Sequence, residues 1–157
     1  MKIVLLTVRK TNEKYLEEAI EAFEKRIKHY ISFEKNVIPE LKNTKNLSVA
    51  QQKEKEAEAI LKQIQPTDEV ILLDEKGLQH SSIGFSEFLR QKMNAGLKRV
   101  VFVVGGPYGF APEVYERSNT KLSLSKMTFS HQMVRLIFVE QLYRAMTILK
   151  GEPYHHE

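Results

Sequence analysis

The sequence contains no cysteine, which removes several kinds of chemistry at once. Disulfide bonds, thiolate metal sites and cysteine nucleophiles are all excluded. No apolar run approaches the length of a membrane span, and the six-residue run before Arg9 is too short for the apolar region of a signal peptide. We therefore expect a cytoplasmic protein that does not enter a membrane.

Several common catalytic and nucleotide-binding motifs are also missing. The sequence has no G-x-G-x-x-G loop after its first predicted strand, no P-loop and no G-x-S-x-G nucleophile elbow. A zinc site at His155 and His156 fails on geometry, because adjacent side chains diverge and the other histidines offer no ligand spacing. These absences argue against a Rossmann enzyme, a P-loop protein and an α/β serine hydrolase, and we expect no metal.

What is present is an ordinary globular composition. The 157 residues are 42% hydrophobic and 28% charged, which suits a single domain over residues 1–157. The formal charge of +4 permits a polyanionic partner without requiring one. Much of the positive charge excess lies in residues 117–157, which contain six Lys or Arg residues and three Glu residues.

Predicted strands and helices alternate along the chain. Continuous apolar runs predict buried strands, and apolar residues at helical spacing predict the helices that cover them. This order favours an α/β fold, and we expect a three-layer α/β/α sandwich with a mostly parallel sheet. The expected strands cover residues 3–8, 31–38, 69–74, 99–104 and 121–127, and the expected helices cover residues 15–30, 48–66, 82–96, 112–117 and 131–149.

Residue types typical of helix ends support these boundaries. Thr11 or Asn12 can cap the first helix, Ser48 the second and Ser82 the third, because their side chains accept hydrogen bonds from free N–H groups. Gly96 is placed to end the third helix. Residues 75–82, between the third strand and the third helix, are predicted as a turn-rich loop.

The segments with most chemical character lie near the C-terminus. The fourth predicted strand runs into GGPYG, the fifth into LSLSKMTFSHQMVR, and the chain ends in PYHHE. Each segment has a plain alternative: glycine and proline are common turn residues, and His131 alone is more often packed than catalytic. Arg135 lies one helical turn after His131 on the same helix face. It could bind a phosphate or carboxylate group as a clamp, or it could simply be a solvent-exposed arginine.

Taken in order, these segments resemble the ribosomal RNA large subunit methyltransferase H family, of the SPOUT class of knotted methyltransferases. The resemblance covers the whole length, including the MKIVLLTV start and ILLDEKG, and is densest over residues 103–155. It implies a deep trefoil knot near the C-terminus, a homodimer, and methylation of N3 of a pseudouridine in 23S rRNA, on assembled ribosomes, with S-adenosyl-L-methionine. His156 departs from the usual family ending and is given no role.

The resemblance also implies site residues. His131, Arg135, Tyr154 and His155 would surround the target base, with Arg135 stabilising negative charge and His155 favoured as proton acceptor. The tail that carries Tyr154 and His155 would act within its own chain or from the partner subunit. The cofactor would be held by Leu73, Gly105, Leu124, Ser125, Lys126, Met127, Thr128 and Phe129.

Other functions remain open at this point. A knotted methyltransferase acting on another RNA, such as tRNA, would use the same cofactor loops. A non-catalytic ribosome-associated module could keep the fold without the cofactor. A nucleotide-binding protein without methyl transfer is disfavoured, because the phosphate-binding motifs are missing.

Overall fold

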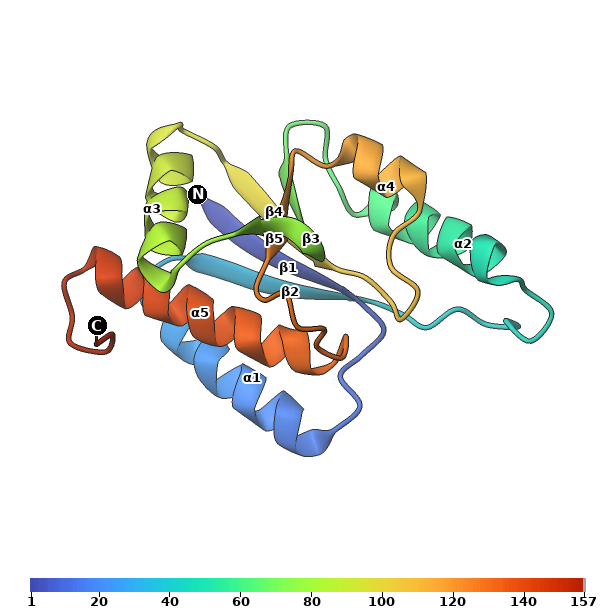
Figure 1. Cartoon of the computed structure of the whole chain (residues 1–157), viewed down its shortest axis with the longest axis horizontal. Helices are drawn as coiled ribbons and strands as arrows, with labels where there is room; N and C mark the ends of the chain where they lie inside the picture. The colour runs from blue at the N-terminus through green and yellow to red at the C-terminus, as the bar shows by residue number, and fades with distance from the viewer. Residues whose placement is uncertain (157) are drawn as a thin grey trace.

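The computed structural model of the chain describes residues 1–156, in which strands and helices alternate from end to end (Figure 1). The alternation predicted from the sequence is therefore confirmed. The elements are β1 (Lys2–Val8), α1 (Lys14–Ile27), β2 (Ser32–Ile38), α2 (Val49–Lys62), β3 (Glu69–Gln79), α3 (Ser82–Asn94), β4 (Arg99–Val104), α4 (Pro112–Arg117), β5 (Thr120–Ser123) and α5 (Met133–Leu149).

The strands form one sheet in the order β2-β1-β4-β3-β5, and every neighbouring pair is parallel. Helices α1, α3 and α5 cover one face, and α2 and α4 cover the other (Figure 1). The three-layer α/β/α sandwich is thus confirmed. The trefoil knot implied by the resemblance stays a prediction.

The two central strands explain why their sequences are apolar at every position. In β1, Ile3 and Leu5 pack with the helices of one face, while Val4 and Leu6 pack with those of the other. Because side chains alternate along a strand, a strand covered on both faces needs a continuous apolar run. The same alternation holds in β4, where Phe102 lies in one cluster and the residues beside it lie in the second.

Two of the helix caps differ from the prediction. Ser48 caps α2 as expected: its hydroxyl accepts from the Gln51 N–H at 3.1 Å, and the Gln51 side chain accepts from the Ser48 N–H. The prediction for α1 was wrong, because the helix starts after Glu13, whose side chain makes no cap hydrogen bond. For α3 the prediction was one residue late, since Ser81 is the cap.

The ends of strands β3 and β5 also differ from the prediction. Strand β3 does not end at Asp74: its pairing with β5 breaks after Leu73 and resumes at Leu78, so the expected loop is a bulged strand. Gly77 makes this possible, because a Cβ there would lie 2.5 Å from the backbone carbon of Lys121. Strand β5 ends at Ser123 rather than at residue 127, which releases the following residues from the sheet.

Within residues 1–156, no helix combines the length and the apolar character that crossing a bilayer requires.

Candidate active site

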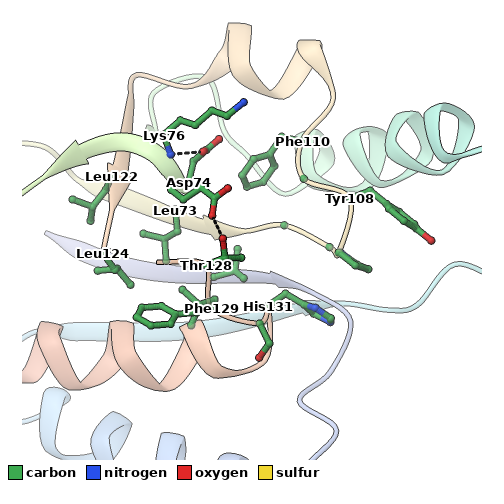
Figure 2. A pocket seen from close by; sticks show the side chains of 18 of the residues that line it. Leu73, Asp74, Lys76, Tyr108, Phe110, Leu122, Leu124, Thr128, Phe129 and His131 are labelled. Carbon is green, nitrogen blue, oxygen red and sulfur yellow. Dashed lines mark hydrogen bonds between the residues drawn. The ribbon is translucent and has the colours of Figure 1, made fainter. Parts of the chain in front are cut away.

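A cavity of about 750 Å³ lies where β3, β4 and β5 end their pairing. In parallel α/β sheets, ligands commonly bind at the carboxyl ends of the strands. Figure 2 shows Leu73, Leu124 and Phe129 gathered on one side of this space, with Tyr108 and His131 on its opposite side. The wall therefore combines an apolar part with an aromatic and titratable rim.

The cavity brings together segments that are far apart in the sequence. Seven of the eight residues predicted to hold the cofactor line it; Lys126 does not. Their role as cofactor ligands stays a prediction. The predicted residues on the wall are Leu73, Gly105, Leu124, Ser125, Met127, Thr128 and Phe129.

The glycine loop after β4 forms one wall of the cavity. Gly105 packs against the Phe110 ring, which a Cβ at position 105 would approach to 3.0 Å. Gly109 has φ of +81°, a conformation that side-chain-bearing residues rarely adopt, and its N–H donates to the Gly106 carbonyl at 3.2 Å. The loop thus turns tightly and presents backbone groups to the cavity.

The opposite wall is the loop after β5, which short polar side chains hold in shape. The Ser123 hydroxyl donates to the Ser125 carbonyl at 2.9 Å, and the Ser125 hydroxyl accepts from the Met127 N–H at 2.9 Å. Thr128 crosses to β3 and donates to Glu75 at 2.5 Å (Figure 2). These local bonds compete with strand pairing, which explains why an alternating sequence leaves the sheet here.

The remaining wall contains polar residues that the sequence reasoning missed. The Tyr115 hydroxyl donates to Asp74 at 2.5 Å, and burial together with this bond raises the pKa of Tyr115 to about 12. The Lys121 ammonium lies 5.6 Å from the centre of the Tyr115 ring. Asp74 could have been found from the sequence, since it directly follows the predicted cofactor residue Leu73 at a strand end.

His131 lies on the rim of the cavity, and its place beside the target base stays a prediction. Burial lowers its pKa below the usual 6.5, and the positive charges of Arg135 and Arg9 lower it further. The imidazole is therefore neutral at pH 7 and can accept a proton.

Arg135 is not among the residues that line the cavity, and its role as an anion clamp stays a prediction. It is 1% exposed, and burial lowers its pKa to about 10. Its guanidinium donates to the carbonyls of Val8, Arg9 and His131 at 2.9 to 3.0 Å and to the Thr11 hydroxyl at 3.2 Å. These bonds use four of the five N–H groups of the guanidinium, and they tie the residues before α5 to the end of β1.

The C-terminal tail lies beside the other end of α5 (Figure 1). The Tyr154 hydroxyl donates to Glu140 at 3.0 Å, and Arg144 Nη1 lies 3.2 Å from His155 Nδ1. Glu140 and Arg144 lie about 10 and 17 Å along α5 from Met133 at the helical rise of 1.5 Å per residue. Tyr154 and His155 are not among the residues that line the cavity of their own chain, whereas His131 is.

The Arg144 contact also limits the chemistry of His155. A guanidinium can only donate, so His155 Nδ1 must accept, and a neutral ring then carries its proton on Nε2. In this arrangement His155 offers an N–H donor rather than a free acceptor. Among residues 1–156, no group of three His, Asp or Glu side chains is placed to hold a metal ion.

Comparison with known proteins places this geometry in a class. Residues 1–155 match a family model described as "Predicted SPOUT methyltransferase". A solved structure with similarity is the SpoU methyltransferase AviRb from Streptomyces viridochromogenes, in complex with the cofactor AdoMet, with a TM-score of 0.47 and 11% identity. The match covers 96% of this chain and 58% of that longer chain.

Curated relatives are much more similar. A protein of Parabacteroides distasonis is 61% identical over the full length of both chains, and one of Christiangramia forsetii is 60% identical over 99% of each. Both are named "Ribosomal RNA large subunit methyltransferase H". The chain belongs to the SPOUT methyltransferase family and, within it, to the ribosomal RNA large subunit methyltransferase H proteins.

Proposed function

We propose that this protein methylates N3 of a pseudouridine in 23S rRNA, on assembled ribosomes in the cytoplasm, with S-adenosyl-L-methionine as methyl donor. The observation that carries the proposal is the cavity between the glycine loop and the loop after β5, with a neutral His131 on its rim. It lies in a chain whose relatives, similar over their full length, carry the name of an rRNA methyltransferase.

The residues on the wall suit such a cofactor. Leu73 and Leu124 offer apolar surfaces for an adenine ring, and the loops at 105–109 and 124–129 offer backbone donors and acceptors for its edge. Bound S-adenosyl-L-methionine supplies an electrophilic methyl group. The acidic side chains of Asp74 and Glu75 also suit polar or positively charged parts of the same molecule.

Methyl transfer to N3 requires removal of the imide proton from the base. We assign this step to His131, because its ring is neutral and lies at the cavity rim. His155, favoured from the sequence, instead has Nδ1 engaged by Arg144, so we assign it a hydrogen bond from Nε2–H to a carbonyl oxygen of the base. Arg135 is a positioning residue that holds the backbone at His131.

The distance between the rim and the tail favours a site shared between two chains. Tyr154 and His155 are held at Glu140 and Arg144, about 10 and 17 Å along α5 from its first residue, so we infer that a second copy supplies the tail if all three surround one base. We therefore propose a homodimer in which each cavity is completed by the partner's tail. In a symmetric dimer the same exchange forms both sites.

Mass spectrometry of large-subunit rRNA tests the reaction. Cells lacking the protein should lack one methyl group at one pseudouridine, and purified protein with S-adenosyl-L-methionine should restore it on isolated ribosomes. His131→Ala protein serves as the control and should restore the methyl group far more slowly than the unchanged protein. Unchanged rRNA in the deletion strain, or transfer to naked rRNA but not to ribosomes, would contradict the proposal.

A further inference from the structure

Glu56, in the middle of α2, is a buried carboxylate that the proposed reaction does not use. It is 3% exposed, and neither of its oxygens has a hydrogen-bond partner among residues 1–156. Its helix neighbours Ala57 and Ile60 belong to the apolar cluster under that face of the sheet. A charged group in such surroundings needs an explanation, because buried polar groups are almost always hydrogen-bonded.

The surroundings of Glu56 do not supply that partner. Burial raises its pKa, and the nearby Gln52 and the positive charge of Arg9 offset this only in part. Arg9 itself pairs with Glu40, 3.7 Å away. The carboxylate thus keeps its capacity to accept hydrogen bonds.

Glu56 faces the back of the glycine loop. A Cβ at position 106 would lie 2.5 Å from Glu56 Oε1 and 3.1 Å from Oε2, so the carboxylate is packed directly against Gly106. Gly106 lines the cavity on its other side, and so does Lys53, one turn before Glu56 on α2. A single helix therefore contacts both the loop and the cavity.

We propose that Glu56 is a positioning residue for the cofactor loop, whose carboxylate accepts the backbone N–H of Gly106 or Tyr108 when the cofactor is bound. The inference rests on the proposed function, which places the cofactor against this loop. Pro107 has no N–H and the Gly109 N–H donates to the Gly106 carbonyl, so Gly106 and Tyr108 are the candidate donors to the carboxylate. Gly106 lets the backbone approach the carboxylate because it has no side chain.

Such a contact couples the cavity to Glu56. Without cofactor, the buried carboxylate of Glu56 has no hydrogen bond and destabilises the folded chain. With cofactor bound, its hydrogen bond to the glycine loop stabilises the conformation of that loop. Coupling of this kind is reciprocal: the contact at Glu56 strengthens cofactor binding by the same free energy by which bound cofactor strengthens the contact. Removing the carboxylate should weaken cofactor binding without weakening the cofactor-free fold. A merely structural residue would lower both together.

Calorimetry with S-adenosyl-L-methionine and thermal melting without it separate these cases. Glu56→Ala should raise the dissociation constant about tenfold or more, while its melting temperature without cofactor stays equal to or above that of the unchanged protein. Glu56→Gln keeps an acceptor oxygen without the charge and should fall between the two. Glu58→Gln, an exposed carboxylate on the same helix, is the matched control and should change neither quantity.

A second pair of variants tests the contact itself. Gly106→Ala should weaken binding because its methyl group would meet Glu56 Oε1. If the contact between Gly106 and Glu56 causes both losses of affinity, the double variant Gly106→Ala/Glu56→Ala will lose less binding free energy than the two single variants lose together. Unchanged affinity of Glu56→Ala, or a parallel fall in affinity and melting temperature, overturns the inference alone. Absence of cofactor binding by the unchanged protein overturns the proposed function as well.

Discussion

Burial decides what each charged residue near the cavity can do. Arg135 and His131 lie one turn apart, and the sequence placed both against the target base. The structure keeps His131 on the rim but buries Arg135, where main-chain carbonyls take its donors. A pattern of residue types predicts which face of a helix a side chain occupies, but not whether the chain itself already provides its partners.

Replacing Arg135 tests its structural role. Arg135→Ala should lower the free energy of unfolding by about 3 kcal/mol, because it leaves buried carbonyls at Val8 and Arg9 without donors. For a chain of this size that corresponds to a fall of roughly 10 °C in melting temperature. Arg90→Ala, which removes an exposed arginine paired with Glu87, should leave the melting temperature nearly unchanged. If the Arg135→Ala protein were as stable as the unchanged protein and lost only methyl transfer, Arg135 would be assigned to anion binding in the reaction instead.

The lowered pKa of His131 predicts the shape of the pH profile. The ring is the proton acceptor only when neutral, so activity should persist as pH falls to about 6.5 and decline below it, as His131 becomes protonated. His131→Ala should lower kcat by about 10² to 10⁴ and remove this acid limb. Single-turnover rates from pH 5 to 8 measure both.

Arg9 provides the control for this assignment. Its positive charge helps to lower the pKa of His131, so Arg9→Gln should move the acid limb to higher pH without abolishing turnover. A limb that does not respond to Arg9, or that persists in His131→Ala, would assign the titration to another group.

Among the elements, those with strong periodicity were predictable and the segments that form the site were not. The apolar runs of β1 and β4 and the cap at Ser48 are local signals that the fold retains. Residues 124–127 alternate like a strand, yet Ser125 and Thr128 bind their own loop and Glu75 instead. Such competition between local hydrogen bonds and sheet pairing depends on tertiary neighbours, which a single sequence does not reveal.

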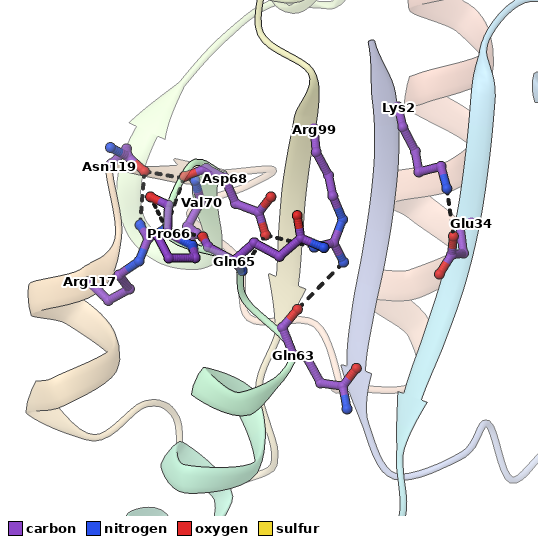
Figure 3. A network of polar contacts seen from close by, with 10 residues as sticks. All are labelled: Lys2, Glu34, Gln63, Gln65, Pro66, Asp68, Val70, Arg99, Arg117 and Asn119. Atoms are coloured by element: carbon purple, nitrogen blue, oxygen red, sulfur yellow. Dashed lines mark hydrogen bonds and ion pairs between the residues drawn. The ribbon is translucent and has the colours of Figure 1, made fainter.

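The start of β3 and the start of β5 are held together by a polar network at the amino ends of these strands, whereas the cavity lies at their carboxyl ends (Figure 3). Arg117, at the end of α4, donates to the carbonyls of Gln65 and Asp68 at 2.9 and 3.1 Å. Asn119 accepts from the Val70 N–H at 2.8 Å and donates to the Val70 carbonyl at 2.8 Å. This network fixes the register of the short strand from which the cavity loop emerges.

Removing Arg117 should therefore loosen the edge strand. Arg117→Ala should cost about 1–2 kcal/mol of unfolding free energy and speed hydrogen exchange of the amides in β5 and at Val70, measured by mass spectrometry. Arg117→Lys keeps the charge but offers a different donor geometry, so it should recover only part of the loss. Full stability with weaker ribosome binding would instead make Arg117 an RNA contact.

At the scale of the whole molecule, the length of α5 is the basis for the proposed second copy. The helix separates the cavity at its N-terminal end from the tail at its C-terminal end (Figure 1). Glu140 and Arg144 hold Tyr154 and His155 against the helix, and neither ring lines the cavity of its own chain. In the proposed dimer, the tail of a second, symmetry-related chain would bridge this separation.

Mixing two inactive variants tests this arrangement directly. His131→Ala lacks the rim histidine and His155→Ala lacks the tail histidine, so either protein alone should be nearly inactive. Unfolding and refolding an equal mixture should give about half mixed dimers, each with one intact cavity, and so about a quarter of the original activity. A double variant mixed with unchanged protein supplies the reference for random exchange. If the tail acted within its own chain, the mixture of single variants would stay inactive, because no chain would carry both histidines.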